Sequence, residues 1–134
     1  MNITPIINRL YFARRARAIA SYKGHAEELQ MQVLRYLISA ATQTEWGKEH
    51  GYASIRTYED FANRVGINSY EELKGYILRM RQGEKDVLWR GKVNWYAKSS
   101  GTTNDKSKFI PVSKEGLKNV HYLGGTDCVA ALIK

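Results

Sequence analysis

The sequence is poor in cysteine, proline and histidine. It has one cysteine, Cys128, and two prolines among 134 residues. A single cysteine excludes an internal disulfide framework and is typical of a reducing compartment, so we expect a cytoplasmic protein. Because Cys128 lies in an apolar helical segment, we expect a small core residue and not a nucleophile. His25, His50 and His121 are too scattered to predict a metal site.

Long apolar runs are also missing. The first apolar stretch, Ile3 to Ala20, is interrupted by four arginines, so it lacks the apolar centre of a secretory signal. No run approaches the roughly 20 residues of a membrane-spanning helix. Hydrophobic residues make up 43% and charged residues 25%, which is ordinary globular composition. The sequence therefore predicts a soluble protein without a membrane partner.

Acidic residues are missing from the first 24 positions, although the chain has a net charge of +8. The basic residues there are Arg9, Arg14, Arg15, Arg17 and Lys23. A basic leading helix suits a nucleic acid or an anionic membrane surface, but also a solvated face or a face packed on an acidic part of the same protein. No zinc-finger spacing or stacking-aromatic pattern accompanies it, so we expect no nucleic-acid partner.

Helical periodicity dominates the first half of the chain. Thr4 and Pro5 indicate a helix start, and a second helix should begin near His25. Its predicted buried stripe consists of Leu29, Val33, Leu37, Ile38 and Ala41. The following segment, "TQTEWGKEHGY" at residues 42–52, is interrupted by glycines and reads as a last turn and a connection.

Two short motifs predict further helix starts. In "TYED", Thr57 precedes Asp60 by three residues, and in "SYEE", Ser69 precedes Glu72 by three. Each hydroxyl can accept from the backbone N–H three residues on, while the carboxylate reaches back to the cap. The helix capped by Ser69 should run from Tyr70 to about Arg81, with its inward positions at Leu73, Ile77 and Met80. We interpret these motifs as structural and not functional.

The pattern then changes to β-branched and aromatic residues. We expect strands at Val93–Lys98 and Lys108–Val112, the second at an edge because Pro111 cannot donate to a ladder. Ser113 suits the cap of a final helix. That helix contains Gly124 and Gly125, each costing about 1 kcal/mol relative to Ala. Either another backbone packs closely there or the helix breaks.

These elements predict an α/β fold. A helical region at residues 1–90 precedes a strand–loop–strand unit at 91–113, and residues 114–134 begin a further helix. The apolar face at the end of the chain, "CVAALIK", has no helix stop signal, so we expect the front part of a longer protein.

The loop between the strands, "SSGTTNDKSK", is rich in groups that suit a polyphosphate. Gly101 can adopt a positive φ and admit a ligand close to the backbone. Lys106 or Lys108 could supply a point charge. The hydroxyl donors are Ser99, Ser100, Thr102 and Thr103. The loop is neither a Walker A motif nor a dinucleotide fingerprint, because the glycines are missing. Composition alone predicts a polar hairpin turn equally well.

The loop resembles a known motif. "SSGTT" followed by a lysine is similar to the phosphate-binding loop of the adenylate-forming superfamily. The closer resemblance is to the acyl acid–amido synthetases, also called the auxin-responsive promoter family, whose loop is followed by a lysine, two apolar residues and a proline, here 108–111. "QVLRYLISAATQTEWGKEHGY" and "VGINSYEELKGYILRMRQGEKDVLW" also resemble this family, over about residues 28–134. Asn104 replaces a second glycine of the superfamily, and Gly66 a frequent proline.

The resemblance implies part of a larger adenylating domain. Family members use ATP and Mg²⁺ to convert a carboxylic acid into an acyl-adenylate, which an amino acid then attacks. It implies that Ser99, Ser100, Gly101, Thr102 and Thr103 hold the β- and γ-phosphates, with Lys108 as a supporting charge. No catalytic residue is expected here, because the adenine, ribose and acyl sites and the C-terminal domain lie downstream in the family. We expect the full-length protein to be a monomer.

Two alternatives stay open from the sequence. One is a stand-alone basic helical module whose hairpin binds phosphate or polyanions. The other is an inactive, truncated remnant of the family, which should expose apolar surface at residues 129–133 and self-associate.

Overall fold

The computed structural model describes residues 4–100 and 107–132, and it divides the chain into two units. Unit 1 comprises residues 1–30 and 114–134, and unit 2 comprises residues 31–113. The assignment of residues 1–134 to one adenylating domain is not tested by this division and stays a prediction.

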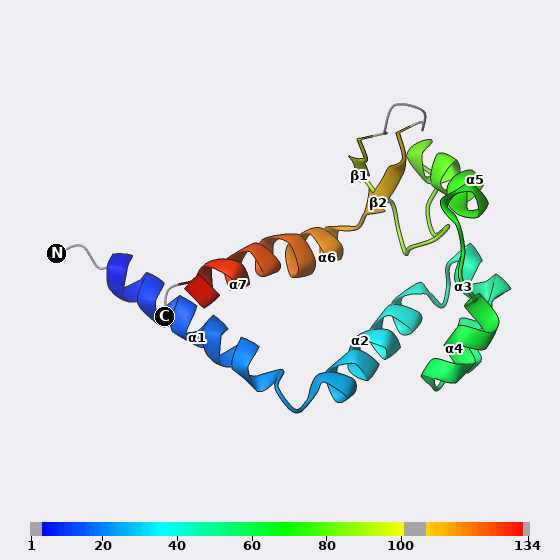
Figure 1. The fold of residues 1–134 in the computed structure, drawn as a ribbon. Coiled ribbons are helices and arrows are strands. Elements are labelled where there is room, and N and C mark those ends of the chain that lie inside the picture. Colours follow the sequence, from blue (N-terminus) through cyan, green and yellow to red (C-terminus); the bar gives the residue numbers. More distant parts are fainter. Residues whose placement is uncertain (1–3, 101–106, 133–134) are drawn as a thin grey trace. The chain divides into compact units, whose positions relative to one another are not determined.

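The elements are mostly helical, with one two-stranded antiparallel sheet (Figure 1). In chain order they are α1 (Thr4–Ser21), α2 (Ala26–Ala41), α3 (Glu45–Glu49), the 3₁₀ turn η1 (Tyr52–Ser54), α4 (Tyr58–Val65), α5 (Tyr70–Arg81), β1 (Trp95–Lys98), β2 (Phe109–Val112), α6 (Lys114–Gly116), the π-helical segment η2 (Leu117–Tyr122) and α7 (Leu123–Leu132). The predicted α/β fold, with a hairpin between a helical region and a further helix, is confirmed.

Unit 1 is formed mainly by α1 and α7, which lie side by side (Figure 1). The Arg15 guanidinium donates to both carboxylate oxygens of Asp127, at 2.7 and 2.9 Å. One of the explanations considered for the basic first helix, packing on an acidic part of the same protein, therefore holds for Arg15. Arg9, Arg14 and Arg17 are exposed, as in the solvated alternative.

The final helix differs from both expectations for its glycines. The helix passes through Gly124 and Gly125 without a break, and no described atom outside its own backbone lies within 4 Å of a Cβ added at either position. Cys128 is exposed, so its prediction as a core residue is wrong. The buried residue is Ala130, which lies about 200° further round the helix. Packing of α7 on one side buries this position and leaves Cys128 outside.

Unit 2 contains two hydrophobic clusters. The first consists of Ile38, Ala41, Tyr52 and Ile55, and the second of Met80, Val87 and Val93. The half-buried Trp89 packs against both clusters and so connects α2 with α5.

The predicted stripe of α2 is only partly correct. Ile38 and Ala41 are buried, but Val33 is 57% and Leu37 44% exposed. Leu34 packs against the first cluster instead. Leu34 and Ile38 lie one turn apart, and Val33 and Leu37 each precede them by one residue, about 100° round the helix. The core of unit 2 therefore meets α2 on the neighbouring face.

The segment at 42–52 is not just a connection, because it contains the short helix α3. Thr44 is fully buried and caps this helix by accepting from the N–H of Gly47 at 3.0 Å. The N–H groups of Glu45 and Trp46 donate to the carbonyls of Asp86 and Val87 at 2.8 and 3.1 Å. A loop distant in sequence thus satisfies the first turn of α3, and a local pattern cannot predict this.

Both predicted capping boxes are confirmed. Thr57 and Asp60 begin α4, and Ser69 and Glu72 begin α5. Hydrogen bonds from the backbone N–H groups of Arg56 and Thr57 lower the pKa of Asp60. Hydrogen bonds with the Ser69 side chain and with its backbone N–H lower the pKa of Glu72. Helix α5 spans Tyr70–Arg81 as predicted, with Ile77 and Met80 buried and Leu73 half-buried.

The two strands are shorter than predicted. They pair from Trp95 with Val112 to Lys98 with Phe109. Val93 is buried in the second cluster instead of belonging to β1. Lys108 lies just outside β2, where its N–H donates to the Ser99 hydroxyl instead of to a backbone carbonyl. The final helix begins at Lys114, directly after the predicted cap residue Ser113.

Candidate functional site: the base of the hairpin

The candidate phosphate-binding residues lie at the end of the hairpin. Ser99 and Lys108 are half-buried and face each other where the loop joins the two strands, and we call this place the base of the hairpin loop, or the base. Ser100 is exposed. Gly101, Thr102 and Thr103 lie outside the described residues, as does Lys106. The structure therefore brings together two of the predicted residues, and the phosphate role of all six stays a prediction.

Ser99 and Lys108 close the base with two hydrogen bonds. The N–H of Ser99 donates to the carbonyl of Lys108 at 2.9 Å, and the N–H of Lys108 donates to the Ser99 hydroxyl at 3.0 Å. A side-chain oxygen thus accepts where an antiparallel ladder uses a carbonyl. The Ser99 hydroxyl keeps its own proton for donation to a ligand, so structural and binding roles are compatible.

Tyr70, the first residue of α5, contacts the same base. Its hydroxyl accepts from the N–H of Phe109 at 3.0 Å, and the Lys108 Nζ lies 5.7 Å from the centre of its ring. This distance is within the range of a cation–π interaction. Sequence reasoning missed Tyr70 as a site residue, although it had identified the Ser69 capping box that fixes the start of α5.

Arg81, the last residue of α5, contacts the hairpin as well. Its guanidinium carbon lies 3.7 Å from the centre of the Phe109 ring. Helix α5 therefore contacts the start of β2 from both of its ends, which fixes the base relative to the helix. Two cations thus lie beside aromatic rings at this end of the hairpin, Arg81 at Phe109 and Lys108 at Tyr70.

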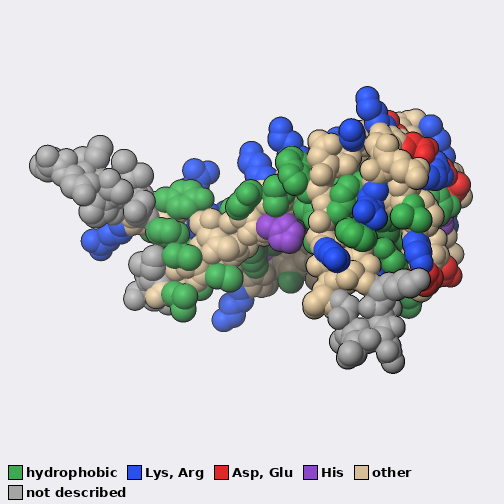
Figure 2. Space-filling model, turned by 90° about the horizontal axis from the view of Figure 1, so that it is seen from above, with side chains coloured by type: hydrophobic (Ala, Val, Ile, Leu, Met, Phe, Trp, Pro, Cys, Tyr) green, Lys and Arg blue, Asp and Glu red, His purple; other side chains and the backbone are tan. Residues whose placement is uncertain are grey.

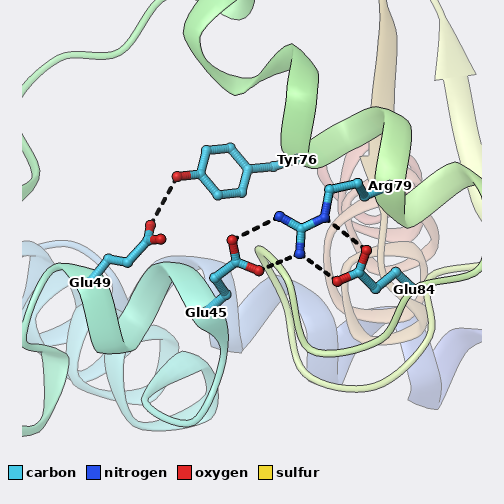
Figure 3. A network of polar contacts seen from close by, with 5 residues as sticks. All are labelled: Glu45, Glu49, Tyr76, Arg79 and Glu84. Carbon is cyan, nitrogen blue, oxygen red and sulfur yellow. Dashed lines mark hydrogen bonds and ion pairs between the residues drawn. The ribbon is translucent and has the colours of Figure 1, made fainter.

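A second polar network fastens the same helix to α3 (Figure 3). Arg79 donates to both oxygens of Glu45 and to both oxygens of Glu84. These bonds hold the pKa of each carboxyl below its usual range and raise that of the guanidinium. Nearby, the Tyr76 hydroxyl donates to Glu49 at 2.9 Å, which raises the pKa of the phenol. Because its charges are mutually paired, the network is structural.

A hollow of about 400 Å³ lies elsewhere in unit 2, between α2 and η1. Its lining includes Arg35, Ile38, Tyr52, Arg56 and Thr57. Arg56 donates to backbone carbonyls of the preceding turn, and Thr57 caps α4. These side chains perform local structural roles, and we assign no chemistry to this hollow.

Other kinds of site find little support. Within residues 4–100 and 107–132, no three His, Cys, Asp or Glu side chains gather into a group that could hold a metal ion. No helix in this part of the chain is long and apolar enough to cross a membrane. Figure 2 shows that, within each unit, the Lys and Arg side chains on the visible face lie scattered among hydrophobic and other side chains.

The described portion is thus a piece of a mixed α/β fold in which a two-stranded hairpin is held against α5. The model of the GH3 family N-terminal domain matches residues 15–131. The chain belongs to the GH3 family, and the resemblance to acyl acid–amido synthetases is confirmed.

The similarity to named relatives covers only a small part of each relative. The indole-3-acetic acid-amido synthetases GH3.6 and GH3.17 of Arabidopsis thaliana are 29% and 30% identical over 94 and 97 residues, or 69% and 70% of this chain. The jasmonoyl–L-amino acid synthetase JAR4 of Nicotiana attenuata is 27% identical over 105 residues, or 78% of this chain. These matches span 15%, 16% and 18% of the respective relatives.

Proposed function

We propose that this chain is the N-terminal part of an ATP-dependent acyl acid–amido synthetase. Membership of the GH3 family carries this proposal, and the relatives named as amido synthetases support it. The whole enzyme would join a carboxylic acid to an amino acid. The chain would supply part of the ATP site, with the acyl and amino acid sites provided by sequence outside it.

The proposed reaction has two steps. A carboxylate oxygen attacks the α-phosphorus of ATP, the bond to the bridging oxygen breaks, and pyrophosphate leaves. The amino group then attacks the acyl carbon and AMP leaves with the bonding electron pair, while the amine loses its proton. We assign no residue of this chain to that proton transfer.

The hairpin would bind the β- and γ-phosphates during the first step. Negative charge spreads over phosphoryl oxygens in the transition state, so donors held in place before the reaction lower its barrier. The proposed donors are Ser99, Ser100, Gly101, Thr102 and Thr103, with Lys108 as the supporting charge. The fixed base formed by Ser99 and Lys108 supports this role. Mg²⁺ would bind with the nucleotide and balance the charge of its phosphate oxygens.

Pyrophosphate exchange on the whole protein tests the proposal. With a panel of carboxylic acids, labelled pyrophosphate should enter ATP only when an accepted acid is present. Lys108→Met should lower this exchange at least about tenfold, because removal of a positioned transition-state contact costs at least about that factor. Lys85→Met, at an exposed lysine outside the hairpin, is the matched control and should exchange normally. Absence of acid-dependent exchange across a broad panel would refute the function.

A further inference from the structure

The backbone N–H groups of Lys108 and Phe109 both donate to side-chain oxygens. The N–H of Lys108 donates to the Ser99 hydroxyl at 3.0 Å, and the N–H of Phe109 donates to the Tyr70 hydroxyl at 3.0 Å. Two consecutive amides are thus fixed, one by the residue that follows β1 and the other by the first residue of α5. This restricts the backbone that carries the Lys108 side chain.

The Tyr70 ring also contacts the charged end of the Lys108 side chain. The Lys108 Nζ lies 5.7 Å from the ring centre, where the negative face of the ring attracts an ammonium. Both Tyr70 and Lys108 are half-buried, so water screens this attraction less than at a fully exposed pair. One tyrosine therefore restrains both the backbone beside Lys108 and its charged end.

We propose that Tyr70 is a positioning residue, which holds Lys108 in place for the phosphate groups of a nucleoside triphosphate. This inference rests on the proposed function, and it adds a residue from outside the loop. A tyrosine suits the task because phenylalanine would supply the ring without an acceptor for the Phe109 N–H. The capping box of Ser69 and Glu72 fixes the first turn of α5 and hence the origin of the Tyr70 side chain.

The chain contains a matched control for this role. Tyr58 follows the cap Thr57 as Tyr70 follows the cap Ser69, so both are first residues of a boxed helix. Tyr58 is 60% exposed. Tyr70→Phe and Tyr58→Phe therefore make the same chemical change at the same helical position, but only Tyr70→Phe removes an acceptor from the hairpin.

The test uses amide NMR spectra of the 134-residue chain during titration with sodium tripolyphosphate. In the wild type, the amide signals of Lys108 and Phe109 should shift with saturable binding. Tyr70→Phe should weaken binding at least about threefold and accelerate hydrogen exchange at the Phe109 amide. Tyr58→Phe should match the wild type in both measurements. Unfolding midpoints of both variants verify that each chain is folded.

Two results would overturn the inference. One is a wild-type titration in which the Lys108 and Phe109 amides do not respond. The other is a Tyr70→Phe chain that binds tripolyphosphate as tightly as Tyr58→Phe does. Failure of the enzymatic proposal is seen separately, in the acid-dependent exchange assay. A whole protein without such exchange, whose tripolyphosphate binding still depends on the Tyr70 hydroxyl, would lose the adenylation function and retain this role of Tyr70.

Discussion

At the scale of single residues, Gly47 shows how closely the backbone packs at the start of α3. It is buried, and a Cβ added there would lie 2.0 Å from the carbonyl oxygen of Ala41. In the sequence, Gly47 interrupts the helical pattern. Its structural reason is a close approach between the end of α2 and the first turn of α3.

We expect Gly47→Ala to destabilise the chain by about 1–3 kcal/mol, because the backbone of Ala41 must shift to admit a methyl group. Gly75→Ala is the control, since Gly75 lies within α5 with nothing within 4 Å of an added Cβ among the described residues. That change should stabilise the chain by about 0.5–1 kcal/mol through helix propensity. Urea unfolding measures both, and equal effects of the two substitutions would contradict the packing argument.

At the scale of secondary-structure elements, α5 connects most parts of unit 2. Its Ile77 and Met80 are buried, and Met80 belongs to the second cluster. Arg79 joins it to α3 and to the segment that follows α5 (Figure 3). Tyr70 and Arg81 contact the hairpin. Events that loosen α5 should therefore reach the candidate site as well as the core.

Stability of unit 2 should depend on pH through the Arg79 network. The guanidinium lowers the pKa of Glu45 and Glu84 in the folded chain, so the unfolded chain binds protons more readily. The contribution of these carboxylates is complete above their ordinary pKa of about 4.3 and is lost as the pH falls through the lowered values. We expect the urea midpoint to fall on acidification below about pH 5.

Asp60, Glu72 and Asp127 also have lowered pKa values, so they too contribute to the acid dependence. Variants are therefore needed to isolate the contribution of the Arg79 network. Glu45→Gln should reduce the midpoint at pH 7 and flatten its decline in acid. Glu71→Gln alters an exposed pair with Lys74 in the same helix, and such pairs contribute little. A Glu45→Gln chain with the full wild-type acid dependence would rule out a role for this network.

At the scale of the whole molecule, each of the two units is stabilised internally by different interactions. Unit 2 has two hydrophobic clusters. In unit 1, Ile6, Leu10 and Leu132 are 59%, 65% and 84% exposed, and the bidentate Arg15–Asp127 pair joins α1 to α7. Unit 1 should consequently open more readily than unit 2.

Asp127→Asn tests this difference. The change removes the charge that faces Arg15, whose side chain is only 17% exposed, so α1 should lose part of its support. Hydrogen exchange should accelerate in α1 and α7 while the amides of α5 keep their wild-type rates. Thr126→Ser, which keeps the adjacent hydroxyl that donates to the carbonyl of Tyr122, is the control. Acceleration spread equally over both units would contradict separate stabilisation.

Local signals predicted much of the fold. The boxes at Thr57 and Ser69 fixed two helix starts, since each cap and its carboxylate lie within one turn. Errors arose where a distant partner decides the outcome. Val33 is exposed because the neighbouring face of α2 is buried, and Cys128 is exposed because α7 buries Ala130 on nearly the opposite side. Hydrophobicity alone does not identify the buried face. Of the candidate site, the sequence indicated Ser99 and Lys108 but not Tyr70.

The sequence by itself determined the starts of α4 and α5, the hairpin, the lack of an internal disulfide and the family resemblance, because these depend on neighbouring residues, on the single cysteine and on a contiguous motif. Only the tertiary structure decided that the Asp86 and Val87 carbonyls complete α3 and that Tyr70 holds the base of the hairpin. Tyr70 and Phe109 are 39 positions apart. A hydrogen bond between them depends on packing of the hairpin against α5, which no local pattern encodes.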